Sequence, residues 1–181
     1  MLFRSFEPQT QHTASGTWSS LGTGSSNGVN NYVTALAVVG NEVYVGGYFT
    51  SAGGVSARNV ARFNTQTNTW STLGTGSSNG VFGSNVNALA VVGNEVYVGG
   101  AFISAGGVFA NNVARFNTQT NTWSSLGTGS SNGVSRGGVS GGLVPTVFAL
   151  AVVGNEVFVG GNFTLAGGVS ANRVARFNGR H

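Results

Sequence analysis

A nearly identical octamer occurs three times in the chain, and this repetition constrains the fold more than any other feature of the sequence. GNEVYVGG occupies residues 40–47, recurs at 93–100 and returns as GNEVFVGG at 154–161. The three tryptophans follow the same spacing and lie at Trp18, Trp70 and Trp123. Each opens a W-S-S/T-L-G-T-G-S-S-N-G-V segment. A period near 53 residues predicts a repeat architecture in which each unit packs mainly on its neighbours.

Within one unit the sequence predicts four short strands. They are VTALAVV at 33–39, EVYVGG at 42–47, NVARFN at 59–64 and TWSTL at 69–73. Each is rich in β-branched or aromatic residues and is bounded by Gly, Asn, Ser and Thr turns. No helical period is present. Because ALAVV and VYV are nearly continuous apolar runs, the first two strands are expected to be buried on both faces.

Four strands per unit, a period near 50 and sheets covered on both sides are typical of a β-propeller blade. The predicted fold class is therefore all-β, a β-propeller of four-stranded antiparallel blades with three blades per chain. The blades are expected at about 33–74, 86–127 and 147–178, with an insertion at 135–146. Residues 16–22 are predicted to be an outer strand that completes the blade at 147–178. Residues 1–15 resemble a decayed strand of a preceding blade, and 179–181 are expected to be a tag or linker remnant.

The segment ALAVVGNEVYVGGYFTSAGGVSARNVARFNTQTNTWSTLG resembles a kelch-type blade. The likeness lies in the doubled glycine Gly46-Gly47, the aromatic Phe63 and Trp70 seven residues later. The repeats also resemble those of bacterial secreted and surface proteins that spell GG-x-F-x-x-A-G-G-V. This resemblance covers about residues 16–178 and implies an extracellular or cell-surface setting; the chain itself leaves the compartment open. Some kelch-type folds are enzymes and many are interaction platforms.

Three blades cannot surround a central axis, so the sequence predicts self-association. A heterologous, head-to-tail interface closes a ring when the rotation per subunit divides a full turn. Two copies would give six blades and three would give nine, and the dimer is favoured because six- and seven-bladed rings are the usual kelch sizes. The alternative is that the chain is a piece of a longer propeller.

Composition narrows the possible partners. Eight Arg and four Glu give a net charge of +4, but the arginines are scattered singly, so nucleic-acid binding is not expected. No apolar run approaches the ~18 residues of a membrane span, so no membrane partner is expected. With no cysteine, and with histidines only at positions 12 and 181, neither a metal nor another cofactor is expected.

Each unit carries one glutamate and one arginine, which are predicted to pair across neighbouring strands as structural contacts. These residues are Glu42 and Arg62, Glu95 and Arg115, and Glu156 and Arg176. Paired-carboxylate hydrolysis would need a second acid in one cleft, and the one acid outside the repeat is Glu7. The chain is therefore predicted not to be an enzyme.

Differences between the units gather in two connections that should share one rim of a propeller, where partners commonly bind. The candidate contacts on this rim are Tyr32, Tyr48, Arg58, Phe82, Phe109, Arg136, Asn162 and Arg173. Aromatic rings beside Asn and Arg would suit a protein or a glycan, although unconstrained drift of loops explains the variation equally well. The predicted function is a self-assembling scaffold or protein-interaction module, and the alternative is a lectin-like glycan-binding propeller.

Overall fold

A computed structural model describes residues 16–137 and 144–179 of the chain. The predictions for residues 1–15, which include Glu7 and His12, and for His181 lie outside the described residues. So does the middle of the insertion at 135–146. The described chain is all-β, and its only helical turns are three short 3-10 segments, η1 (Gly24–Ser26), η2 (Gly76–Ser78) and η3 (Gly129–Ser131). The all-β prediction is confirmed.

Three antiparallel sheets, which we call the main sheets, contain the predicted strands. The first main sheet has the order β1 (Tyr32–Val39), β2 (Glu42–Tyr48), β5 (Val60–Asn64) and β6 (Thr69–Thr72). The second has the order β7 (Val81–Val92), β8 (Glu95–Ala105), β10 (Val113–Asn117) and β11 (Thr122–Ser125), with β9 (Val108–Phe109) paired to β8. The third has the order β13 (Thr146–Val153), β14 (Glu156–Asn162) and β17 (Val174–Asn178). Each sheet is a meander in which neighbours along the chain pair.

Short hairpins fill the connection between the second and third strands of each unit. They are β3 (Ser51–Ala52) with β4 (Val55–Ser56), the end of β8 with β9, and β15 (Leu165–Ala166) with β16 (Val169–Ser170). β12 (Val134–Ser135) adds to the last of these. These hairpins could not be predicted from the sequence, because two-residue strands are too short to show a period.

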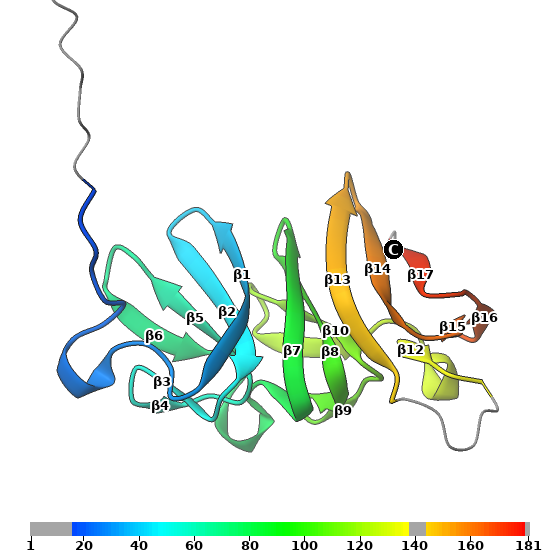
Figure 1. Cartoon of the computed structure of the whole chain (residues 1–181), viewed down its shortest axis with the longest axis horizontal. Helices are drawn as coiled ribbons and strands as arrows, with labels where there is room; N and C mark the ends of the chain where they lie inside the picture. The colour runs from blue at the N-terminus through cyan, green and yellow to red at the C-terminus, as the bar shows by residue number, and fades with distance from the viewer. Residues whose placement is uncertain (1–15, 138–143, 180–181) are drawn as a thin grey trace, which may run out of the picture.

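The main sheets stand side by side in chain order, with β1, β7 and β13 as neighbouring strands (Figure 1). The first and third main sheets lie at opposite ends of this row, and residues 16–22 lie at the end nearest the first sheet. In the single chain residues 16–22 are not a strand. The outer strand predicted at 16–22 is therefore not formed within the single chain.

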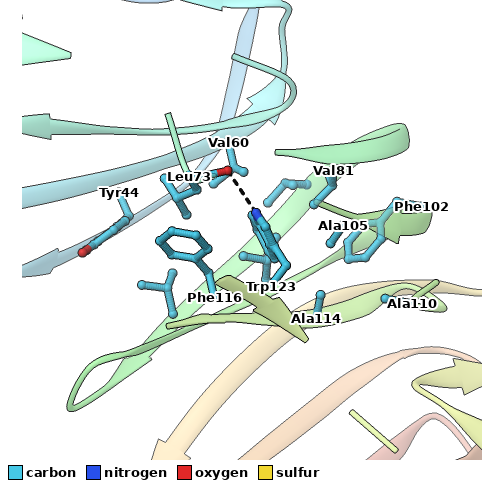
Figure 2. Packing of buried hydrophobic residues seen from close by; sticks show 13 residues of the cluster. Tyr44, Val60, Leu73, Val81, Phe102, Ala105, Ala110, Ala114, Phe116 and Trp123 are labelled. Carbon is cyan, nitrogen blue, oxygen red and sulfur yellow. Dashed lines mark hydrogen bonds between the residues drawn. The ribbon is translucent and has the colours of Figure 1, made fainter. Parts of the chain in front are cut away.

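Tryptophan anchors the core of the second main sheet. Trp123 packs with Phe116, ring centroids 5.1 Å apart, and its indole Nε1 donates a hydrogen bond to the carbonyl oxygen of Leu73 at 2.9 Å (Figure 2). Tyr44 of the first sheet and Phe102 of the second belong to the same buried cluster. The core thus bridges successive units, as repeat architectures require.

Burial on both faces holds for the middle of the row and fails at its two ends. Every residue of β8 except Ile103 is buried or half-buried. In β1, by contrast, six of the eight residues are exposed. In β13 four of the eight residues are exposed. The prediction that the first two strands of each unit are covered on both faces is wrong for β1 and β13, because among the described residues no further sheet covers the outer face of the first or the third main sheet.

Candidate functional site

The seams between main sheets are built around one glycine of each doubled pair. A Cβ added to Gly46 would lie 2.5 Å from Cγ1 of Val86, and one added to Gly99 would lie 2.4 Å from Cγ1 of Val147. Because Gly46 on β2 and Gly99 on β8 have no side chain, the next sheet can approach closely at these two positions. The first glycine of each of these pairs therefore has an architectural role.

Gly160 holds the same place in the third main sheet, and no next sheet packs on it. The atom nearest to a Cβ added there is Cβ of Ala149, on the neighbouring strand of the same sheet, at 3.8 Å. Val86 and Val147 pack on Gly46 and Gly99, and their equivalent in the first main sheet is Val33, at the other end of the row. Val33 is 45% exposed, whereas Val86 and Val147 are 0% exposed.

The third strand of each unit shows the same contrast at the third-sheet end of the row. Val60 and Val113, in β5 and β10, are 0% and 1% exposed because the next unit covers them. Their equivalent in β17, Val174, is 64% exposed. The two ends of the row thus expose the two halves of a contact that the chain makes internally twice.

Hydrogen bonds reinforce each internal seam. The hydroxyl of Thr34 donates to the carbonyl oxygen of Val86, and the equivalent Asn87 donates through Nδ2 to that of Val147 at 2.9 Å. The third residue of this series is Phe148, which is exposed and cannot donate. At this one position the end face offers apolar surface in place of a hydrogen bond.

A second set of hydrogen bonds ties each linker to the preceding unit. Arg58 N donates to Oδ1 of Asn79 at 3.2 Å, and Val81 N donates to the carbonyl oxygen of Arg58 at 3.1 Å. One unit later, Asn111 N donates to Oδ1 of Asn132 at 2.8 Å. These bonds fix the N-G-V segments at 79–81 and 132–134 between the unit before and the unit after each of them.

The predicted glutamate–arginine pairs adopt different contacts in different units. In the third unit Nη1 of Arg176 lies 3.4 Å from Oε1 of Glu156. In the first unit Glu42 accepts a hydrogen bond from Nδ2 of Asn64 at 2.8 Å, while Nε of Arg62 donates to Oγ of Ser71 at 2.9 Å. The register is the same in both units, because Glu42 lies level with Asn64 and Glu156 with Asn178, so the units differ in which polar neighbour the glutamate contacts.

The second unit repeats the glutamate contact of the first. Glu95 accepts from Nδ2 of Asn117 at 2.8 Å. Arg115 lies level with Tyr97 on one side and Ser124 on the other. The repeated acids therefore contact the neighbouring strand at the positions where β2 and β8 begin.

Tyr44, on β2 between Glu42 and Gly46, is 4% exposed and lies level with Arg62. Burial raises the pKa of its phenol above the ordinary value, and the charge of Arg62 partly offsets this increase. The phenol thus stays neutral well above physiological pH and behaves as a core side chain.

Three of the rim candidates converge on one hollow between the first and second main sheets. Tyr48, Arg58 and Phe82 line a cavity of about 550 Å³, and Cζ of Arg58 lies 4.2 Å from the centroid of the Phe82 ring. Asn30 and Asn31 add amide groups to the same lining. The hollow therefore combines aromatic surface, a guanidinium and amides, and its residue set is not repeated in the other units.

The remaining rim candidates lie outside this hollow. Tyr32 is exposed and level with Tyr48 across β1 and β2, and Phe109 is exposed on β9. Asn162 ends β14, where its Nδ2 donates to the carbonyl oxygen of Val144 at 3.5 Å. Arg136 follows β12 directly. The sequence placed these residues on one rim but could not indicate which of them share a pocket.

Arg173 occupies a backbone position where the other two units have asparagine. Its φ is 65°, in the left-handed region, as are those of Asn59 and Asn112 at 61° and 64°. Each asparagine is buried and accepts a hydrogen bond through Oδ1, from Phe49 N at 3.1 Å and from Phe102 N at 3.3 Å. Arginine tolerates this conformation less well and cannot accept that bond.

Substituting Arg173→Asn is expected to stabilise the chain by about 1–2 kcal/mol, from relief of left-handed strain and one added hydrogen bond. Thermal unfolding followed by circular dichroism at fixed protein concentration should show a rise of roughly 2–4 °C per kcal/mol. The reverse change, Asn112→Arg, is the matched control and should lower the midpoint. An unchanged midpoint for Arg173→Asn would contradict the assignment.

Among the residues that the structure describes, no group of three or more His, Cys, Asp or Glu gathers as a metal site would require. Within the same residues, no helix has the length and apolar character needed to cross a membrane.

Comparison with known proteins supports the repeat. A family model described as a domain of unknown function (DUF5122), β-propeller, matches residues 41–66, 94–119 and 155–179. The chain is built of β-propeller-type repeats. Each match begins at the turn before β2, β8 or β14 and ends near the end of the third strand of that unit.

Two computationally designed proteins are among the solved structures to which the chain is similar. Ika4 is 17% identical over 90% of this chain and 99% of its own, with a TM-score of 0.43. Ika8 is 18% identical over 84% of this chain and 48% of its own, with a TM-score of 0.39. No curated protein matches the chain.

Proposed function

We propose that the chain is a non-catalytic β-propeller module that contributes three four-stranded blades and closes a ring by head-to-tail association with identical chains. One observation carries the proposal. The first main sheet exposes Val33, and the third exposes Val174 and leaves Gly160 uncovered, whereas the equivalent residues in the middle of the row are buried against each other.

The chemistry of the two end faces favours a second copy over an unrelated partner. Val33 and Leu36 of one copy match the pair Val147 and Leu150, which packs on Gly99 within the chain. An interface between copies would therefore repeat a packing that the sequence already specifies. Burying these exposed apolar side chains supplies the hydrophobic driving force.

The number of copies follows from ring size. Two chains would form six blades, within the usual range of four to eight for propellers, whereas three chains would form nine. The dimer is therefore favoured. Its interface is heterologous, since the first sheet of each copy contacts the third sheet of the other.

A scaffold role agrees with how the repeated polar residues are used. Glu42 and Glu95 bond to asparagines of the neighbouring strand, and Glu156 pairs with Arg176. These contacts join neighbouring strands within each sheet, so we assign the repeated acids a structural role.

Light scattering of the purified chain after size-exclusion chromatography tests the proposal. We expect a mass of twice 18.3 kDa at micromolar concentration. A folded species at 18.3 kDa over the whole concentration range would overturn self-association. Three times the monomer mass would instead indicate a nine-bladed ring.

The hollow lined by Tyr48, Arg58 and Phe82 favours a second candidate function, a lectin-like site for a glycan. Aromatic faces beside amide and guanidinium donors are suited to sugar rings and hydroxyls. A glycan array probed with the pure protein tests this candidate, with Phe82→Ala as the variant that should lose binding. Because the lining is not repeated, we expect one glycan per chain, and no reproducible hit would count against the candidate.

A further inference from the structure

We propose that residues 17–21 of one copy form the fourth strand of the third main sheet of the next copy, with Trp18 seated in a cavity beside β17. This inference rests on the proposed head-to-tail association and identifies the contact that completes it. The second copy supplies both the strand and the side chain that the third sheet lacks.

The second main sheet provides the template for this contact. Trp123 lies level with Phe116 in the pairing of β11 with β10. Its ring sits over Gly106, where an added Cβ would come within 2.0 Å of Cδ1 of the indole. Its Nε1 reaches the carbonyl oxygen of Leu73 in the preceding unit at 2.9 Å. Three features thus hold the tryptophan: an aromatic partner, a glycine platform and a carbonyl acceptor.

The first main sheet repeats the same three features. Trp70 and Phe63 have ring centroids 5.1 Å apart. A Cβ added to Gly53 would lie 2.1 Å from Cδ1 of Trp70, whose Nε1 donates to the carbonyl oxygen of Leu21 at 3.0 Å. The arrangement is therefore a property of the repeat.

The third main sheet has the receptor but, among the described residues, no fourth strand. Phe177, Gly167 and Leu126 stand at the positions of Phe116, Gly106 and Leu73, and all three line one cavity of about 330 Å³. A Cβ added to Gly167 would meet nothing nearer than the carbonyl oxygen of Ser131, at 3.7 Å. The cavity occupies the place that an indole fills in the other two sheets.

The segment at 17–21 has the sequence of the strand that fills the equivalent place in the second main sheet. It reads TWSSL, letter for letter the same as residues 122–126, which include strand β11. In the single chain Trp18 is fully exposed and its segment is not a strand. Residues 17–21 thus carry an exposed tryptophan and the sequence of a fourth strand, and the third main sheet has an edge where a fourth strand can pair.

The linker after this segment is suited to the same docking. Asn27 is equivalent to Asn79 and Asn132, which accept hydrogen bonds from Arg58 N and Asn111 N of the preceding unit. In the assembled pair the preceding unit belongs to the other copy, and the equivalent donor is the main-chain N–H of Asn172. The strand and its linker would thus bind together.

Disulfide trapping tests the register of this strand, because the chain contains no native cysteine. Arg115 lies level with Ser124 and Ala114 with Ser125, so Arg176 is expected level with Ser19 and Ala175 with Ser20 of the other copy. Hydrogen-bonded and non-hydrogen-bonded pairs alternate along an antiparallel ladder. Both register pairs are therefore tested, each by mixing Ser19→Cys with Arg176→Cys chains, or Ser20→Cys with Ala175→Cys chains, under mild oxidation.

At least one mixture should give a covalent pair of chains on a non-reducing gel. The double variants Arg62→Cys with Ser71→Cys, and Ala61→Cys with Thr72→Cys, place the same register pairs within one chain and calibrate the chemistry. Ser19→Cys mixed with Arg115→Cys is the negative control, because β11 already occupies that edge. If native chains have twice the monomer mass but neither mixture crosslinks, strand docking is wrong while the ring proposal stands. If the native chain is monomeric, both fail.

Trp18→Ala gives an independent measurement. Buried tryptophans dominate interface energetics, so the dissociation constant of the assembly should rise at least about 30-fold. Circular dichroism of the variant should match the parent, because Trp18 is fully exposed in the single chain. An unchanged dissociation constant in a folded variant would overturn the proposal.

Discussion

The variant Gly160→Val is expected to fold normally and to run as an 18.3 kDa monomer in light scattering, where the parent has twice that mass. Within the chain a Cβ added to Gly160 meets only Ala149, at van der Waals distance. In the proposed ring the same Cβ would collide with Val33 of the next copy, as a Cβ on Gly99 would collide with Val147 at 2.4 Å. The substitution therefore separates folding from assembly.

Two controls define this result. Gly99→Val introduces the same side chain at the internal seam and should lower the melting temperature of the chain itself, because overpacking costs about 1–3 kcal/mol. Gln119→Val adds valine at an exposed turn away from either end face and should leave the mass unchanged. A Gly160→Val protein that kept twice the monomer mass would contradict the packing proposed for the ring.

The second large effect is expected for Gly106→Ala, which should destabilise the chain much more than Gly167→Ala does. Both glycines have left-handed φ values, 57° in each case, so the backbone strain that alanine introduces should be the same at both positions. They differ in surroundings, since Gly106 supports the ring of Trp123 and Gly167 faces the cavity beside β17. The difference between the variants, about 1–3 kcal/mol, isolates the cost of displacing the indole.

This comparison is best made by thermal unfolding in the Gly160→Val background, where the chain is expected to be monomeric. There Gly106→Ala should melt lower than Gly167→Ala by roughly 2–4 °C for each kcal/mol of difference. Restoring Gly160 should then make Gly167→Ala harmful to assembly, since Trp18 of the other copy would need that space. Equal melting temperatures in the monomeric background would show that Trp123 tolerates a methyl group.

The repeat and its strands could be predicted because the signals are local. Runs of β-branched and aromatic residues between Gly, Asn, Ser and Thr turns predicted the strands. The hairpins at β3 and β4 were missed because a strand of two residues has no pattern to recognise. The exposed face of β1 was missed for a different reason: its nearly continuous apolar run is typical of a strand covered on both faces, and among the described residues no sheet covers it.

The candidate site was less accessible to sequence reasoning. The rim residues were found because they vary between units, yet only Tyr48, Arg58 and Phe82 share a hollow, and that depends on how two sheets meet. The sequence predicted that Glu42 pairs with Arg62, whereas Glu42 lies level with Asn64 and its carboxylate accepts a hydrogen bond from the amide of that residue. Strand spacing alone does not specify which of several polar neighbours a side chain will choose.

The hydrogen bonds that Asn79 and Asn132 accept from the units before them have a consequence for how the chain unfolds locally. Stability in such an array is a sum over nearest-neighbour seams, so the second main sheet is held from both sides and each end sheet from one. Local unfolding should therefore begin at the ends of a lone chain, with the amides of β8 exchanging last. A closed ring has no end unit, and in it this gradient along the chain would vanish.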